Sequence, residues 1–320
     1  MKRPFTKKRL FATAATASVL LLAVAGCTTA ESTPTETTTP ATEATDATGT
    51  ATFAASNGDC DAMAATLRDV ESANPDLDDP ELSAVCDGDS LVISSNSIPD
   101  YLYIATTPGS PRISELTMTI PVDPTEADEP GSVPLLGALG VAVNGVPIYG
   151  PTGGTGGDVQ SLEGALSECG SHSGPTDFHL HWFGIADGVD CLYDADEVAS
   201  GESLVVGWAA DGYPIMSGVV CSDDECSEVV QLTSSWQLTD ESQFATDTWA
   251  AHSYVEGSGD LDECNSRVDS DGQYRYYSTT TFPYFVGCYY STTTFPYFVG
   301  CYYGDVADGA LPGGMSGTEG

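Results

Sequence analysis

The chain has 320 residues, and its 47 aspartates and glutamates outnumber nine lysines and arginines, which gives a formal net charge of −38. Five of the nine basic residues precede residue 10, so the remainder has four arginines, no lysine and a formal charge of −43. Nucleic-acid backbones, nucleotide phosphates held by a lysine loop, pyridoxal Schiff bases and polybasic membrane contacts all require basic groups, so these classes are excluded.

The N-terminus predicts a lipoprotein signal peptide over residues 1–26. Basic residues lead into an apolar run from Leu10 to Ala25, about 16 residues long, whereas a membrane span needs roughly 20. The run ends in Val24-Ala25-Gly26-Cys27, which resembles the lipobox of bacterial lipoproteins. We expect an exported protein whose lipidated Cys27 is its only membrane contact, on the outer side of the cell membrane, at the cell surface or the periplasmic face. The alternative is an ordinary signal peptide followed by a coincidental cysteine.

Two segments are predicted to be disordered. Residues 27–57 are mostly Thr, Ala, Glu, Ser and Pro and cannot bury enough apolar surface to fold, so they predict a flexible tether. The Gly-rich segment 305–320 predicts a disordered tail. Residues 58–304 remain, which is long enough for one large domain.

Within this domain the pattern predicts a mainly β fold with one or two short helices. Residues 61–72 are the best helix candidate, because Asp61 could cap them and Met63, Leu67 and Val70 recur at helical spacing. Strands are predicted at 91–98, 101–106 and 115–121. The rest is rich in Gly, Pro, Thr, Tyr and Val, with few long helical patterns.

Two segments predict the same β-hairpin. Residues 140–150 and 207–217 share five of eleven aligned positions, with Asn144-Gly145 in one and Asp211-Gly212 in the other. Such dipeptides between apolar runs favour a tight hairpin in which both central residues have positive φ. Similar segments follow each hairpin, so we expect two related halves, about 133–200 and 203–303, packed as one disulfide-stapled domain.

The cysteine count favours four disulfides. Beyond Cys27 there are nine cysteines, but residues 278–290 are repeated letter for letter at 291–303, which duplicates one of them. Such a repeat indicates a recent duplication or an assembly error. Because export implies an oxidising compartment, we expect nearest-neighbour bridges, with a metal–thiolate site as the alternative. The expected pairs are Cys60 with Cys86, Cys169 with Cys191, Cys221 with Cys226, and Cys264 with Cys288 or Cys301.

Three of the four histidines lie within ten residues and form the candidate site. His179 and His181 would point to the same face of a strand, and His172 could supply a third ligand. Three imidazoles with an open position suit zinc or copper, and Glu168 and Asp177 could orient the rings. The alternatives are a histidine site without metal and simple packing; His252 is expected to be structural.

A weaker signal is Asp269-Ser-Asp271-Gly272, which resembles the start of a calcium loop but lacks the distal glutamate. Calcium is therefore less favoured than zinc or copper. Three functions remain open. The first is a surface-anchored module that binds metal or an unknown ligand, the second an extracellular metal-dependent hydrolase or oxidase, and the third a structural or adhesive domain.

The hairpin segments GVAVNGVPIYGP and GWAADGYPI, the LDECN segment and the FPYFVGCYYG ending together resemble the YHYH domain family. This family comprises exported bacterial proteins and eukaryotic relatives named for a Tyr-His-Tyr-His motif, and it implies no assigned reaction. The resemblance covers roughly residues 90–304. Here the first motif reads Phe178-His179-Leu180-His181, whereas residues 274–277, Tyr-Arg-Tyr-Tyr, keep neither histidine. A function that needs the second pair is therefore in doubt.

Overall fold

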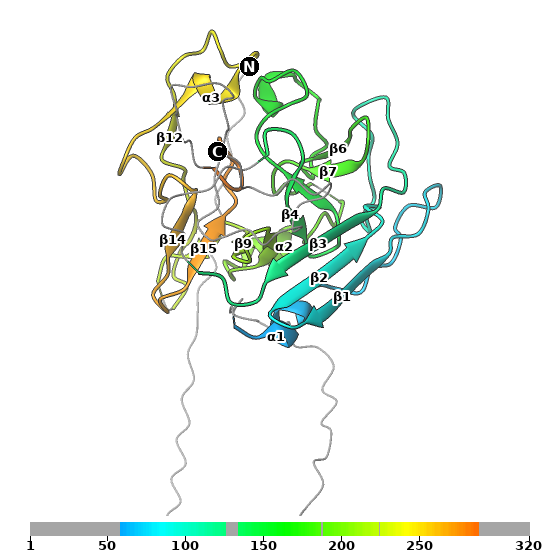
Figure 1. Ribbon diagram of the computed structural model, residues 1–320. Helices are drawn as coiled ribbons and strands as arrows, with labels where there is room; N and C mark the ends of the chain where they lie inside the picture. Colours follow the sequence, from blue (N-terminus) through cyan, green and yellow to red (C-terminus); the bar gives the residue numbers. More distant parts are fainter. Residues whose placement is uncertain (1–57, 126–133, 187, 224, 288–320) are drawn as a thin grey trace, which may run out of the picture. The chain divides into compact units, whose positions relative to one another are not determined.

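The computed structural model describes residues 58–125, 134–186, 188–223 and 225–287. The predicted signal peptide, tether and tail lie outside these residues, as does the second copy of the repeat. The described chain is mainly β, as predicted, with short helices between the strands (Figure 1). No helix in these four ranges is both long and apolar enough to cross a bilayer.

The elements form four sheets, of three, eight, two and two strands. The helical elements are α1 (Cys60–Ala65), η1 (Val159–Ser161), α2 (Ala195–Ala199) and α3 (Thr248–Ala251). The strands are β1 (Leu82–Asp87), β2 (Ser90–Ser95), β3 (Leu116–Pro121), β4 (Ala138–Ala142), β5 (Pro147–Tyr149), β6 (Ser171–Ser173), β7 (Phe178–Leu180), β8 (Val205–Ala209), β9 (Pro214–Met216), β10 (Val219–Cys221), β11 (Val229–Gln231), β12 (Trp236–Leu238), β13 (His252–Tyr254), β14 (Ser266–Val268) and β15 (Tyr274–Tyr277).

Helix α1 is shorter than the predicted helix over residues 61–72. Asp59, rather than Asp61, caps it by accepting a hydrogen bond from Ala62 N at 3.1 Å. The Thr66 hydroxyl then donates to the Met63 carbonyl at 2.7 Å, and the backbone N–H of Arg68 donates to Val143 O at 3.0 Å. Because a local side-chain bond takes the Met63 carbonyl and a distant carbonyl takes the Arg68 N–H, the helix ends at Ala65 although the apolar periodicity continues.

Strands β1, β2 and β3 form an antiparallel sheet beside α1 (Figure 1). The predicted strand at 101–106 is wrong, because this segment pairs with no other strand. Its backbone bonds instead to one buried side chain: Asn74 donates to Tyr101 O at 2.7 Å and accepts from Tyr103 N at 2.8 Å. An asparagine amide thus takes the place of a neighbouring strand.

The eight-stranded sheet has the order β14-β15-β9-β8-β4-β5-β7-β6. Both predicted hairpins are present, as β4–β5 and β8–β9, and β4 pairs with β8 at the centre. On each side a parallel pairing follows, β5 with β7 and β9 with β15, and then an antiparallel edge strand. The pairing pattern therefore reads the same from both ends, while the common origin of the two halves stays a prediction.

The hairpin turns differ from the expected form in which both central residues have positive φ. Positive φ occurs at Gly145 and Gly212, at 85° and 91°, but not at the preceding Asn144 and Asp211. These two side chains instead accept a hydrogen bond from the backbone N–H two residues on, at 3.2 Å and 3.3 Å. The turn thus combines an Asx bond with a single left-handed glycine.

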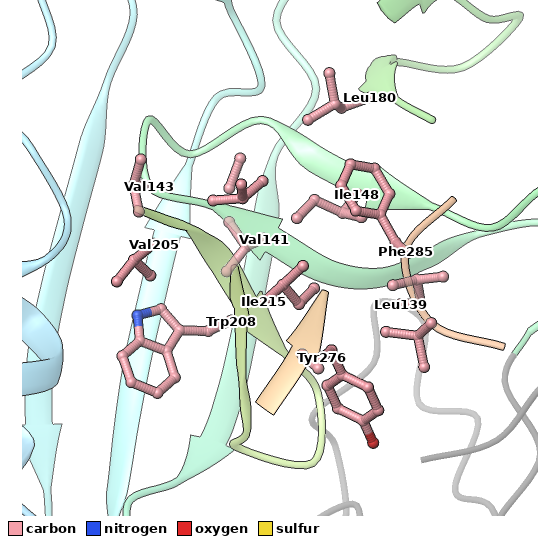
Figure 2. Close-up of a cluster of buried hydrophobic side chains, with 14 of the residues drawn as sticks. Leu139, Val141, Val143, Ile148, Leu180, Val205, Trp208, Ile215, Tyr276 and Phe285 are labelled. Carbon is pink, nitrogen blue, oxygen red and sulfur yellow. The ribbon is translucent and has the colours of Figure 1, made fainter. Parts of the chain in front are cut away.

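Glycines bring the two central strands together. A Cβ on Gly140 would lie 2.6 Å from Trp208 O, and a Cβ on Gly207 would lie 2.3 Å from Val141 O. Every residue of β4 and β8 is buried, because apolar side chains cover both faces of the sheet. Figure 2 shows part of this core, which strands β4, β5, β7, β8, β9 and β15 and Phe285 supply.

Disulfides staple the domain. The structure pairs Cys60 with Cys86, Cys169 with Cys191 and Cys221 with Cys226, which matches the nearest-neighbour pairing. Cys264 is also disulfide-bonded, and its partner lies outside the described residues. The Cys169–Cys191 bridge connects the turn before β6 to the chain after β7, so it fixes both flanks of the histidine segment.

Candidate metal centre

The end of the eight-stranded sheet places the three histidines on one face. In β6 and β7, His172 lies directly opposite His179 in the antiparallel register. Phe178 and Leu180, which alternate with the histidines, are 0% and 3% exposed within the apolar core. The period-two alternation of a strand therefore turns His179 and His181 to the opposite face, where His172 meets them.

The imidazoles converge through their Nε2 atoms. The Nε2 atom of His179 lies 3.0 Å from that of His172 and 3.1 Å from that of His181. One ligand atom from each ring falls within 4.8 Å of the others. His179 and His181 are buried and His172 is half-buried, so the cluster is sheltered on two sides.

Each ring uses its other nitrogen, Nδ1, to bond an oxygen atom. His172 Nδ1 lies 3.0 Å from Ala165 O, His179 Nδ1 lies 3.1 Å from Asp177 Oδ1, and His181 Nδ1 lies 2.6 Å from Gly150 O. A carbonyl or carboxylate oxygen only accepts, so each Nδ1 carries the hydrogen. In a neutral ring, Nε2 then presents a lone pair. Three lone pairs thus face one another.

Burial favours the neutral, metal-binding form of His172 and His181. Burial, followed by the neighbouring His179, lowers the pKa of His172 and lowers the pKa of His181 well below its ordinary value. The Asp177 carboxyl behaves differently. Burial acts to raise the pKa of Asp177, but hydrogen bonds from His179 and Tyr149 outweigh it, so this pKa falls below its ordinary value. Asp177 is therefore an ionised acceptor for the His179 ring.

Asp177 and Tyr149 hold the central histidine. The Tyr149 hydroxyl donates to Asp177 Oδ2 at 2.8 Å, and the Tyr149 ring stacks on His179 with centroids 3.9 Å apart and planes 13° apart. Gly174 closes the other side, since a Cβ there would lie 2.7 Å from His179 Cε1. These contacts fix the position of His179, the ring that approaches both of the others.

Of the two acids expected to orient the rings, Asp177 lies against a histidine and Glu168 does not. The Glu168 side chain is exposed and lines a separate apolar hollow, while the backbone carbonyl of Ala165 accepts from His172 instead. Glu168 lies in a turn from Ser167 to Ser171 that is closed by its own backbone bonds, and the carbonyl that reaches the ring belongs to Ala165, which precedes this turn.

Tyr149 and the carbonyls of Gly150 and Ala165 also contact the histidines and were not predicted from the sequence. Tyr149 ends a hairpin strand about 30 residues before His179, and the parallel pairing of β5 with β7 brings the two together. The Tyr-Gly ending of the hairpin segment is the only local signal for it. The two carbonyls have no side-chain signature at all.

The donor set fits a transition metal. Zinc–nitrogen bonds of about 2.0–2.1 Å at tetrahedral angles place each pair of nitrogens about 3.3 Å apart. The two separations from His179, 3.0 Å and 3.1 Å, are close to this value, and all three ligand atoms lie within 4.8 Å of one another. Imidazole suits both zinc and copper. In the described residues no Cys, Asp, Glu or fourth His joins the group. Three protein ligands with an open position characterise catalytic rather than structural zinc sites.

The other histidine and the calcium motif have different surroundings. His252 stacks on Phe282 with centroids 4.0 Å apart, and its Nδ1 lies 2.6 Å from Thr248 O, so it belongs to an aromatic cluster. The carboxylates of Asp269 and Asp271 are ion-paired with Arg267 and Arg275 at 2.7–2.9 Å. Guanidinium groups therefore occupy the positions that a calcium ion would need.

Comparison with known proteins agrees with the sequence motifs. A model of the family described as YHYH protein matches residues 117–291, which is more than half of the chain. These residues include the whole histidine cluster and both hairpins. No curated protein and no solved structure matches the chain. The chain belongs to the YHYH protein family.

Proposed function

We propose that this protein binds one transition-metal ion, zinc or copper, through Nε2 of His172, His179 and His181. The observation that carries the proposal is the set of three Nδ1 bonds to oxygen acceptors. They leave three Nε2 lone pairs within 4.8 Å of one another, where the lone pairs of neutral rings repel and a cation relieves the repulsion. This arrangement is the usual surrounding of metal-bound histidine, whose second nitrogen donates to a carboxylate or carbonyl.

Packing alone accounts less well for the cluster. Two neutral histidines that merely hydrogen-bond to each other need one N–H donor and one lone pair across the contact. With every Nδ1 bonded to an oxygen, neither the pair His172–His179 nor the pair His179–His181 has such a donor. A histidine site without metal would need an extra proton on one of these sheltered rings.

The location is part of the proposal. The lipobox-like residues at Cys27 and the Thr- and Glu-rich tether favour a lipid-anchored domain outside the cell membrane. There, the protein acts as a metal-binding or ligand-binding module held away from the membrane surface.

A second candidate function is an extracellular metal-dependent hydrolase or oxidase. The observation that favours it is the absence, within the described residues, of a fourth side-chain ligand of the usual kinds. An open position on zinc or copper can take water or a substrate. The half-buried His172 is the ring nearest to solvent, so a substrate would approach on its side.

Metal analysis of protein purified without a histidine tag tests the proposal. We expect one zinc or copper ion per chain after exposure to either metal, and loss of that ion in the double variant His179→Ala, His181→Ala. His252→Ala is the matched control, because it removes an imidazole outside the cluster and should keep the ion. Failure of the folded wild-type protein to bind either metal would overturn the proposal.

The same proteins separate a binding module from an enzyme. Hydrolase and oxidase substrates should be turned over by the metal-loaded wild type and by His252→Ala, but not by the double variant, if the open position is catalytic. Full metal occupancy with no turnover in any of them would leave the binding module as the function.

A further inference from the structure

The other end of the eight-stranded sheet carries a cluster in the position that corresponds to the histidines. Arg267 of β14 lies opposite Arg275 of β15, as His172 lies opposite His179. Two residues further on, Tyr277 follows Arg275 as His181 follows His179. The fold thus presents a second set of side chains at a comparable place, with a different chemistry.

Ion pairs organise this second cluster. Arg275, whose side chain is 6% exposed, donates to Asp269 at 2.8 Å and to both oxygens of Asp271 at 2.9 Å and 2.7 Å. Arg267 donates from Nε to Asp269 at 2.9 Å and lies over the Tyr277 ring at 4.9 Å. Two guanidiniums therefore neutralise two carboxylates in a fixed geometry.

The cluster forms one wall of a hollow of about 630 Å³, which is in the size range of small-molecule sites. The half-buried Val220 supplies an apolar surface to it, and Met216 also lines it but is only 2% exposed. The hydroxyls of Ser203, Ser222 and Ser270 also line it, and none of them bonds to another group in the described part of the chain. The hollow thus offers hydroxyl groups that can both donate and accept beside an apolar surface.

Charge excludes ionic ligands from this hollow. A cation would have to displace Arg267 or Arg275 from carboxylates that they already neutralise. An anion would meet the negative charge of Asp223, which also lines the hollow and accepts hydrogen bonds from Ser227, and the field of a chain with a net charge of −38. A neutral ligand with many hydrogen-bonding groups remains.

We propose that this hollow is a second binding site, which takes a carbohydrate. The vicinal hydroxyls of a sugar donate to the outer oxygens of Asp271 and accept from the serine hydroxyls and from Arg267, whose side chain is 35% exposed. The C–H face of the sugar packs on Val220. This site is independent of the proposed metal function.

Saturation-transfer NMR with glucose, galactose, mannose, N-acetylglucosamine, cellobiose and chitobiose tests the proposal on the folded domain. Ser270→Trp fills the rim of the hollow, and Arg267→Ala removes a donor. We expect transfer to at least one sugar in the wild type, and an affinity about tenfold lower or worse in both variants. Ser83→Trp, at an exposed position of β1, is the matched control and should bind like the wild type.

Several outcomes would overturn this proposal. They are no transfer to any sugar, equal transfer in Ser270→Trp, or binding of inorganic phosphate that is lost in Arg267→Ala, which would identify an anion site. The double variant His179→Ala, His181→Ala should retain sugar binding. That result separates failure of this site from failure of the metal site.

Discussion

The substitution Asp177→Ala should weaken metal binding while leaving the protein folded. Asp177 Oδ1 is the acceptor for His179 Nδ1 at 3.1 Å, and its side chain is 14% exposed, at the rim of the cluster rather than in the core. Without this acceptor the His179 ring can turn, or can move its hydrogen to Nε2, and either change removes the central lone pair.

The expected loss follows from what such partners contribute elsewhere. Acceptors behind a metal-bound histidine usually account for about 10–100-fold in metal affinity, which corresponds to about 1.4–2.7 kcal/mol. Asp177→Asn keeps an oxygen that can accept from Nδ1, so its loss should be smaller. Tyr149→Phe keeps both the carboxylate and the ring stack, so its loss should be the smallest of the three.

Competition titration of zinc against a chelator at fixed pH measures these affinities. Thermal unfolding of each metal-free variant is the control for folding. The expected order of zinc affinity, from tightest to weakest, is wild type, Tyr149→Phe, Asp177→Asn and Asp177→Ala. Wild-type zinc affinity in a folded Asp177→Ala variant would refute it, because the carboxylate would then not orient the ring.

Three other predictions follow from contacts described above. Gly174→Ala should lower metal affinity by displacing His179, whereas Gly154→Ala, where an added Cβ meets nothing within 4 Å, should not; the same titration checks both. Hydrogen bonds from Arg275 outweigh burial and lower the pKa of Asp271 to about 2. The stability that this ion pair contributes should therefore be present above the ordinary pKa of an aspartate and be lost as pH falls towards 2. In acid unfolding measurements, Asp271→Asn should not show this pH-dependent loss of stability. Unfolding midpoints should rise with NaCl, because salt screens the repulsion among 47 acidic residues; a flat profile would contradict this.

Local features of this fold can be predicted from sequence. The spacing of His179 and His181 predicts a shared face because side-chain direction in a strand depends only on alternation. The hairpins follow from Asn-Gly and Asp-Gly between apolar runs, and three disulfides follow from nearest neighbours in the chain. In each case the determining residues are adjacent or close in sequence.

Features that depend on distant backbone could not be predicted in this way. Any residue type can offer the carbonyl that Gly150 and Ala165 present to the histidines, so no pattern marks these positions. The segment at 101–106 has the composition of a strand, yet one amide, that of Asn74, takes its hydrogen bonds. Glu168 has the right chemistry for an orienting acid, but its turn directs it to solvent.

The glycine pair at the centre of the large sheet limits how this protein can vary. Gly140 and Gly207 each face a carbonyl oxygen of the opposite strand, so a one-residue slip would force a side chain into backbone. Register between the hairpins is thus determined by excluded volume, with no need for a particular pair of side chains. The two hairpin segments differ at six of eleven aligned positions, but both have glycine at this point. The two ends of the sheet thus carry different side chains, histidines at one and arginines at the other, on either side of one glycine-lined seam.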